Sequence, residues 1–158
     1  MHAHRRGQPR SACYQVARAS AEALSYTASR MSTGRAKILV VEDEAEIRTL
    51  VARLLSQSFD VTQAVDGSDA LDQILAGMRP DLIVCDVMMP RMDGLAFTQE
   101  LKRDPTLARI PVVMLTAKSR PRDMVDGINA GARAYVTKPF KSEELLGKVR
   151  KALGQSPK

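Results

Sequence analysis

Five short runs of strand-forming residues, each followed by an amphipathic stretch, constrain the fold of this chain more than any other feature. The runs lie at Ile38–Val41, Asp60–Ala64, Leu82–Cys85, Val112–Leu115 and Ala134–Thr137. They are too short for helices, and most of them are rich in valine, isoleucine and leucine, which favours buried strands. Strands that are apolar on both faces belong to parallel sheets with helices covering both sides.

The stretches between these runs have apolar residues at the three- and four-residue spacing of a helix. The first helix should begin at Asp43 or Glu44 and carry Ile47, Leu50, Val51, Leu54 and Leu55. We expect the others at Ser68–Leu75, Leu95–Lys102, Arg122–Ala130 and from Ser142 to about Leu153. Right-handed crossovers then favour a doubly wound α/β fold, a five-stranded parallel sheet of order 2-1-3-4-5 in a flavodoxin-like three-layer arrangement.

Two Asp-Gly pairs, Asp66-Gly67 and Asp93-Gly94, precede predicted helices. We interpret both pairs as turns, since Asp and Gly are common turn residues.

The net charge of +6 is concentrated in the N-terminal segment. Residues 1–35 contain six arginines and one glutamate, whereas the remainder has 18 basic and 17 acidic side chains. We expect 1–35 to be a disordered basic extension or to precede a natural start at Met31, although an acid-poor segment also resembles an organellar transit peptide. The predicted domain covers 36–154, with a short tail at 155–158.

Composition argues against several functional classes. Aromatic residues make up 4% of the chain and tryptophan is absent, so direct nucleic-acid binding is not expected. No apolar run reaches the roughly 18 residues of a membrane span. The two cysteines, Cys13 and Cys85, have no spacing typical of disulfide frameworks or zinc sites, and we expect Cys85 to be a buried structural residue. A reducing compartment, and hence a cytoplasmic location, fits this pattern.

Polar side chains follow four of the five predicted strands. Glu42 and Asp43 come after the first, Asp86 after the third, Thr116 after the fourth and Lys138 after the fifth. The carboxyl ends of parallel strands meet at one edge, where ligands bind in such sheets. Three carboxylates beside one lysine would carry excess negative charge, which favours a divalent cation with oxygen ligands, Mg²⁺ or Mn²⁺. A metal beside a carboxylate suits phosphoryl transfer, and carboxylates do form aspartyl-phosphates.

Four segments together resemble the receiver family of bacterial two-component response regulators. They are Ile38–Glu44, Pro80–Gly94, Pro111–Ala117 and Tyr135–Phe140, in order within about residues 36–153. The resemblance implies a phosphoprotein that takes part in phosphorelay signal transduction.

For the metal site, the resemblance implies that Asp86 is the phosphoacceptor, attacking the phosphohistidine of a sensor histidine kinase or a phosphotransfer protein. Asp43 would bind Mg²⁺ directly and Glu42 through water. Met88 would contribute its backbone carbonyl, which leaves its side chain free to vary.

For the phosphoryl group and the signal, the resemblance implies that the Thr116 hydroxyl and Lys138 bind the phosphoryl oxygens. Lys138-Pro139 matches a cis peptide bond of the family, and cis bonds are largely restricted to X-Pro. Thr116 would move inward and Tyr135 would fill the vacated space. The face formed by the helix at 122–130, the strand at 134–137 and the last helix would then bind an unknown downstream protein.

The sequence departs from the pattern of the receiver family at two places. Arg133-Ala134 stands where many dimerising receivers have acidic residues, so we expect a monomer or a weak dimer. Met88 and Lys118 lie two residues after Asp86 and Thr116, and neither could orient an attacking water. We therefore expect a long-lived phosphoryl group.

The chain stops about five residues after the last predicted helix, so we expect a stand-alone regulator that acts through another protein. We expect no enzymatic activity beyond its own phosphorylation and dephosphorylation. Three alternative functions fit the sequence less well. A haloacid-dehalogenase-type phosphatase needs a second Asp at the position of Met88. A degenerate receiver would lack acceptor-site residues, and a flavin carrier would need a phosphate-binding loop after the first strand.

Overall fold

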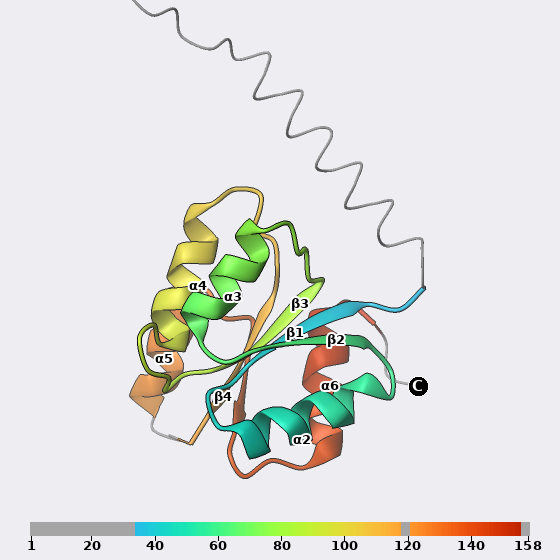
Figure 1. Cartoon of the computed structure of the whole chain (residues 1–158). Coiled ribbons are helices and arrows are strands. Elements are labelled where there is room, and N and C mark those ends of the chain that lie inside the picture. The colour runs from blue at the N-terminus through green and yellow to red at the C-terminus, as the bar shows by residue number, and fades with distance from the viewer. Residues whose placement is uncertain (1–33, 118–120, 156–158) are drawn as a thin grey trace, which may run out of the picture. The chain divides into compact units, whose positions relative to one another are not determined.

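The computed structural model describes residues 34–117 and 121–155, and within 121–127 it describes the side chains of Val125 and Asp126. Five strands and five helices alternate along this part of the chain (Figure 1). The strands are β1 (Lys37–Val41), β2 (Asp60–Ala64), β3 (Leu82–Asp86), β4 (Val112–Thr116) and β5 (Ala134–Thr137). The helices are α2 (Ala45–Ser56), α3 (Gly67–Leu75), α4 (Gly94–Arg103), α5 (Pro121–Ala130) and α6 (Ser142–Ala152).

Nearly all of the predicted N-terminal extension lies outside the described residues. The alternative start at Met31, Cys13 and most of the C-terminal tail lie there too, as does Lys118. What the sequence predicts for these residues stays a prediction.

The five strands form one parallel sheet of order β2-β1-β3-β4-β5. This order confirms the predicted doubly wound α/β fold. The chain order reverses direction between β1 and β3, and the carboxyl ends of these neighbouring strands form the switch point at which such sheets bind ligands.

β1, β3 and β4 are buried on both faces along nearly their whole length, which explains why their sequences are nearly continuous apolar runs, whereas the edge strand β2 has exposed polar residues. On one face Leu39, Ile83 and Met114 pack with Phe97 of α4. On the other face, Val40, Val84 and Leu115 are among the residues that form a second core with α2 and α6. Figure 1 shows α3, α4 and α5 on one side of the sheet and α2 and α6 on the other.

The two Asp-Gly pairs require a correction, because both aspartates cap helices and neither pair forms an isolated turn. The side chain of Asp66 accepts a hydrogen bond from the backbone N–H of Asp69 at the start of α3. The side chain of Asp93 likewise accepts from the N–H of Ala96 in α4. Each carboxylate satisfies a backbone donor that the first helical turn leaves without a partner.

Among the described residues, no helix has both the length and the apolar character needed to cross a membrane.

Candidate functional site

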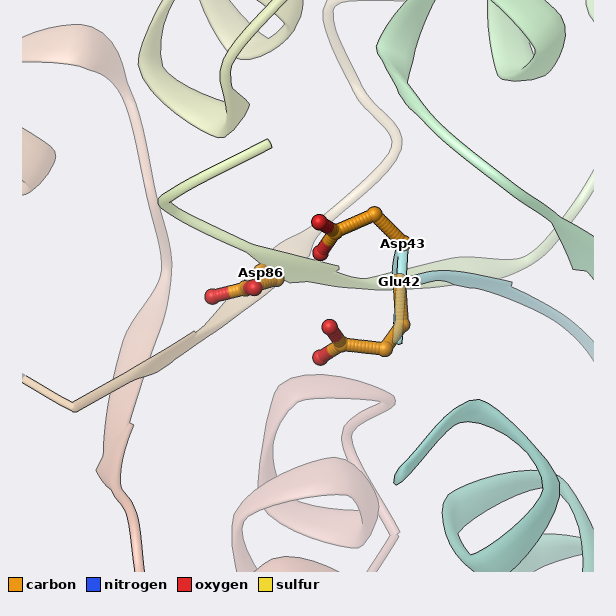
Figure 2. A group of neighbouring side chains, drawn as sticks. All are labelled: Glu42, Asp43 and Asp86. Atoms are coloured by element: carbon orange, nitrogen blue, oxygen red, sulfur yellow. The ribbon is translucent and has the colours of Figure 1, made fainter. Parts of the chain in front are cut away.

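Strand register brings three carboxylates together at the carboxyl edge of the sheet. Val41 of β1 lies beside Cys85 of β3, so the residues that follow them, Glu42 and Asp86, arrive at the same edge. Carboxylate oxygens of Glu42, Asp43 and Asp86 lie within 4.8 Å of one another. Figure 2 shows the carboxyl groups of Glu42 and Asp43 turned towards the Asp86 side chain. The spacing would let one small cation contact all three groups.

Lys138 supplies positive charge to this cluster. Its Nζ donates to Oε2 of Glu42 at 2.8 Å and lies 3.5 Å from Oδ2 of Asp86. The backbone N–H of Lys138 donates to the carbonyl of Thr116 at 2.7 Å, which ties the end of β5 to the end of β4. The peptide bond between Lys138 and Pro139 is cis.

The cluster carries more negative charge than Lys138 neutralises. Glu42 is fully buried, with an exposed fraction of 0%. Burial raises the pKa of Glu42, the ammonium of Lys138 lowers it and the Asp86 carboxylate raises it, with a net result of about 7. The increase comes from burial and from the Asp86 carboxylate, and a further positive charge at this site would favour the ionised form of Glu42. The all-oxygen donor set therefore fits Mg²⁺ or Mn²⁺.

The loop after β1 is held by an arginine of α2 that the sequence did not single out. Nη1 of Arg48 donates to the backbone carbonyl of Glu42 at 2.8 Å and approaches that of Asp43 at 3.4 Å. These contacts fix the backbone that carries two of the three carboxylates. A basic residue one turn into a helix that follows an acidic pair is the signal that could have suggested them.

The remaining predicted residues lie at different depths. Thr116, at the end of β4, is buried with 1% exposure, and Tyr135 in the edge strand β5 is buried with 7% in the core on the face of the sheet that contains Phe97 of α4. The side chain of Met88 is 57% exposed, while its backbone N–H lies 3.4 Å from Oδ1 of Asp86. Cys85 is fully buried, and burial raises the pKa of its thiol well above the ordinary value, which supports a structural role.

The structure also contains an ion pair beside the site that the sequence did not indicate. The guanidinium of Arg91, in the loop between β3 and α4, contacts the carboxylate of Asp66 at the start of α3. The start of α3 has a second contact of this kind, because the Asp69 side chain accepts from the N–H of Val65 at 3.0 Å. The Asp-x-x-Asp spacing is the capping signal that could have identified Asp66.

Comparisons with known proteins agree with this geometry. A family model described as the response regulator receiver domain matches residues 38–150. The chain is 42% identical over 118 residues to the DNA-binding dual master transcriptional regulator RpaA of Synechocystis. It is 44% identical over 115 residues to the phosphate regulon transcriptional regulatory protein PhoB of Escherichia coli.

These matches cover 74% and 72% of this chain, but 48% and 50% of the two relatives. The response regulator PleD of Caulobacter vibrioides is 43% identical over 116 residues, which is 25% of its length. The chain therefore spans half or less of the length of these curated relatives.

Solved structures of similar length share the fold. A putative response regulator from Chloroflexus aurantiacus matches with a TM-score of 0.72 and 30% identity, over 77% of this chain and 99% of that one. The chemotaxis protein CheY4 of Vibrio cholerae matches with a TM-score of 0.71 and 33% identity, over 75% and 98%. Sequence, topology and the acidic edge of the sheet agree, and the chain belongs to the response regulator receiver family.

Proposed function

We propose that this chain is a phosphorylation-dependent switch in which Asp86 accepts a phosphoryl group from a histidine kinase or a phosphotransfer protein. The observation that carries the proposal is the cluster of Glu42, Asp43 and Asp86 beside Lys138 in a receiver fold. Receiver domains in general receive phosphoryl groups from such donors and bind Mg²⁺ at an acidic pocket. The roles of the individual residues are part of this proposal.

In the proposed reaction, a carboxylate oxygen of Asp86 forms a bond to phosphorus while the phosphorus–nitrogen bond of the phosphohistidine breaks. The departing imidazole keeps the electron pair of that bond and takes up a proton. Bound Mg²⁺ would neutralise charge that develops on the phosphoryl oxygens. Asp43, Asp86 and the Met88 carbonyl would hold the ion, and Glu42 would hold it through water.

Lys138 and Thr116 would stabilise the product. The ammonium of Lys138 already lies 3.5 Å from Asp86 and can move from the carboxylates to the added phosphoryl oxygens. The Thr116 hydroxyl, at the end of the adjacent β4, would donate to the same group. A phosphoryl group adds about two negative charges and three acceptor oxygens, enough to bias a switch between two states.

The face formed by α5, β5 and α6 is our proposed output surface. Val125 and Ile128 of α5 are 53% and 62% exposed, and exposed apolar side chains favour protein–protein contact. Tyr135 in the adjacent β5 is buried, so a change at Thr116 could reach this face by repacking Tyr135. The downstream partner would be a protein that prefers one of the two packings.

Acetyl phosphate with Mg²⁺ tests the proposed acceptor without a cognate kinase. Intact mass should show one added phosphoryl group on the wild type and on Asp81→Asn, which alters the other end of β3, and none on Asp86→Asn. The label should persist for minutes after removal of acetyl phosphate, because Met88 offers no acid or amide to orient water. Equal labelling of Asp86→Asn would refute the acceptor, and steady turnover of phosphate would favour a phosphatase.

Beryllofluoride tests the proposed output surface. With Mg²⁺ it should shift the amide resonances of β5, α6 and Tyr135 in the wild type and leave Asp86→Asn unchanged. Shifts confined to the residues around Asp86 would argue against signalling through this face.

A further inference from the structure

The loop between β3 and α4, residues 87–93, contains an unusual backbone conformation. Arg91 has a φ of 64°, the left-handed conformation that side chains other than glycine and asparagine rarely adopt, and it is the one non-glycine residue with positive φ in the described part of the chain. The conformation is unfavourable for a residue with a side chain and persists when surrounding contacts enforce it. The contacts of Arg91 are therefore informative.

Arg91 reaches across to α3. Its Nε donates to Oδ2 of Asp66 at 2.7 Å, and its Nη2 contacts the same oxygen. Asp66 is 3% exposed, whereas the Arg91 side chain is 64% exposed. Fully exposed ion pairs contribute little to stability, but this one has a buried carboxylate as its acceptor and two guanidinium donors.

The two oxygens of Asp66 have different partners. Oδ1 accepts from the N–H of Asp69 at 2.8 Å and caps α3, while Oδ2 accepts from Arg91. Burial acts to raise the pKa of Asp66, but the N–H of Asp69 and the guanidinium of Arg91 outweigh it, so the pKa lies below the ordinary value. Asp66 is thus an ionised, fixed anchor for the loop.

At two glycines, the backbone lies very close to the backbone at the two ends of the same loop. A Cβ at Gly67 would lie 2.9 Å from the carbonyl oxygen of Met92, and a Cβ at Gly94 would lie 2.2 Å from that of Asp86. The N–H of Gly94 also donates to the carbonyl of Val87 at 2.9 Å. Close backbone contacts therefore hold both ends of the loop, and the ion pair of Arg91 with Asp66 holds the residues between them.

We propose that Arg91 and Asp66 are positioning residues for metal binding: their ion pair holds the β3–α4 loop so that Met88 and Asp86 are arranged for Mg²⁺ before the ion arrives. This inference rests on the proposed function of Asp86. Neither residue touches the ion. They act by restricting the loop that carries the Met88 carbonyl, and groups that orient metal ligands have measurable effects on affinity.

Substitutions that preserve the local backbone conformation test the contribution of the ion pair by itself. Arg91→Asn removes the guanidinium but keeps a side chain that tolerates positive φ. Asp66→Asn keeps an oxygen that can cap α3 and removes the charge that faces Arg91. Calorimetry should show Mg²⁺ binding about tenfold weaker in each variant, and the double variant no weaker than either single one.

A second readout needs no metal. In the metal-free protein, amide hydrogens of residues 88–92 should exchange faster in Arg91→Asn than in the wild type, because the loop loses its central contact. Arg91→Lys, which keeps the charge but not the paired donors, should fall between them.

Arg79→Ala is the matched control. Arg79 donates to the carbonyls of Ile74 and Met78 at the opposite end of α3, so its loss weakens α3 without touching the loop. Wild-type affinity in Arg91→Asn and Asp66→Asn would overturn the inference, as would an equal loss in Arg79→Ala. A wild type that binds no Mg²⁺ and takes no phosphoryl group from acetyl phosphate would overturn the proposed function itself.

Discussion

Acidic residues lie at both ends of this sheet, but their surroundings differ. At the amino edge, the Asp81 carboxylate accepts from the N–H of Lys37 at 2.8 Å, and Asp60 lies 3.9 Å from Arg35. At the carboxyl edge, Glu42, Asp43 and Asp86 crowd around the ammonium of Lys138. An acidic residue at a strand end is therefore not by itself a sign of function. Several carboxylates close together, with too few cations to neutralise them, are such a sign.

The difference has an energetic consequence. At the amino edge, Asp81 accepts from a backbone N–H and is expected to stabilise the fold, whereas the exposed contact of Asp60 with Arg35 contributes little. At the carboxyl edge, three carboxylates lie close together and Glu42 is also buried, so we expect this cluster to lower the stability of the metal-free fold. Proteins commonly break local rules of this kind where they bind a ligand.

The largest expected effect concerns the geometry that holds the carboxyl edge together. Gly94→Ala should lower the free energy of unfolding by about 3 kcal/mol, because the new Cβ would lie 2.2 Å from the Asp86 carbonyl oxygen, and neither backbone can yield easily. Gly147→Ala in α6 has open space within 4 Å and should raise it by about 0.5–1 kcal/mol. Urea denaturation followed by circular dichroism measures both, and a tolerated Gly94→Ala would show that this edge is not tightly packed.

The second effect tests whether the carboxyl edge is a cation site. Mg²⁺ at about 100 times its Kd should raise the free energy of unfolding by about 2.7 kcal/mol, because the ion binds the folded chain. Asp86→Ala should lose most of this gain. Asp81→Ala should keep it, since the amino edge has no comparable cluster among the described residues. Thermal unfolding with and without Mg²⁺ gives the answer, and an equal gain in all three proteins would indicate nonspecific ion effects.

A third effect, of opposite sign at the two edges, appears without Mg²⁺. Asp86→Ala should stabilise the metal-free protein by about 1 kcal/mol, because two carboxylates then share Lys138. Asp81→Ala should destabilise it by about 1 kcal/mol, because the N–H of Lys37 loses its acceptor. Denaturation in the presence of a chelator compares them. Destabilisation by both substitutions would mean that the carboxyl edge is not under electrostatic strain.

The fold and the carboxylate cluster at the carboxyl edge could be predicted from the sequence for one reason. Strands buried on both faces are apolar throughout, so a polar residue at the end of such a run is easy to recognise, as with Asp86 after Leu82–Cys85. Parallel pairing then requires these residues to meet at one edge. The family resemblance added roles that the pattern alone does not contain.

The support around the cluster was not visible in the same way. Asp66 and Arg91 are separated by 25 residues, and their contact depends on the positive φ of Arg91 and on the placement of α3. An Asp-Gly pair also fits a turn and a helix start equally well, so the sequence alone does not distinguish a turn at Asp66 from a helix cap. In the sequence, Arg48 looks like any solvent-exposed helix arginine. Its hydrogen bond to the carbonyl of Glu42 becomes evident only in the structure.

The smallest predicted effect sharpens the comparison, because Asp66 follows β2 at the carboxyl edge and yet is satisfied like the acids of the amino edge. Its pKa in the folded protein lies below the ordinary value, so the stability it contributes is present above that ordinary value, near pH 4, and is lost as pH falls through the folded pKa. Asp66→Asn should therefore be less stable than the wild type by up to about 1 kcal/mol at pH 6, and the gap should narrow as the pH falls below about 4. Urea denaturation at several pH values measures the gap. A constant gap would mean that the Asp66 carboxylate is not what stabilises the loop, and a satisfied acid would then be no better an anchor than a neutral one.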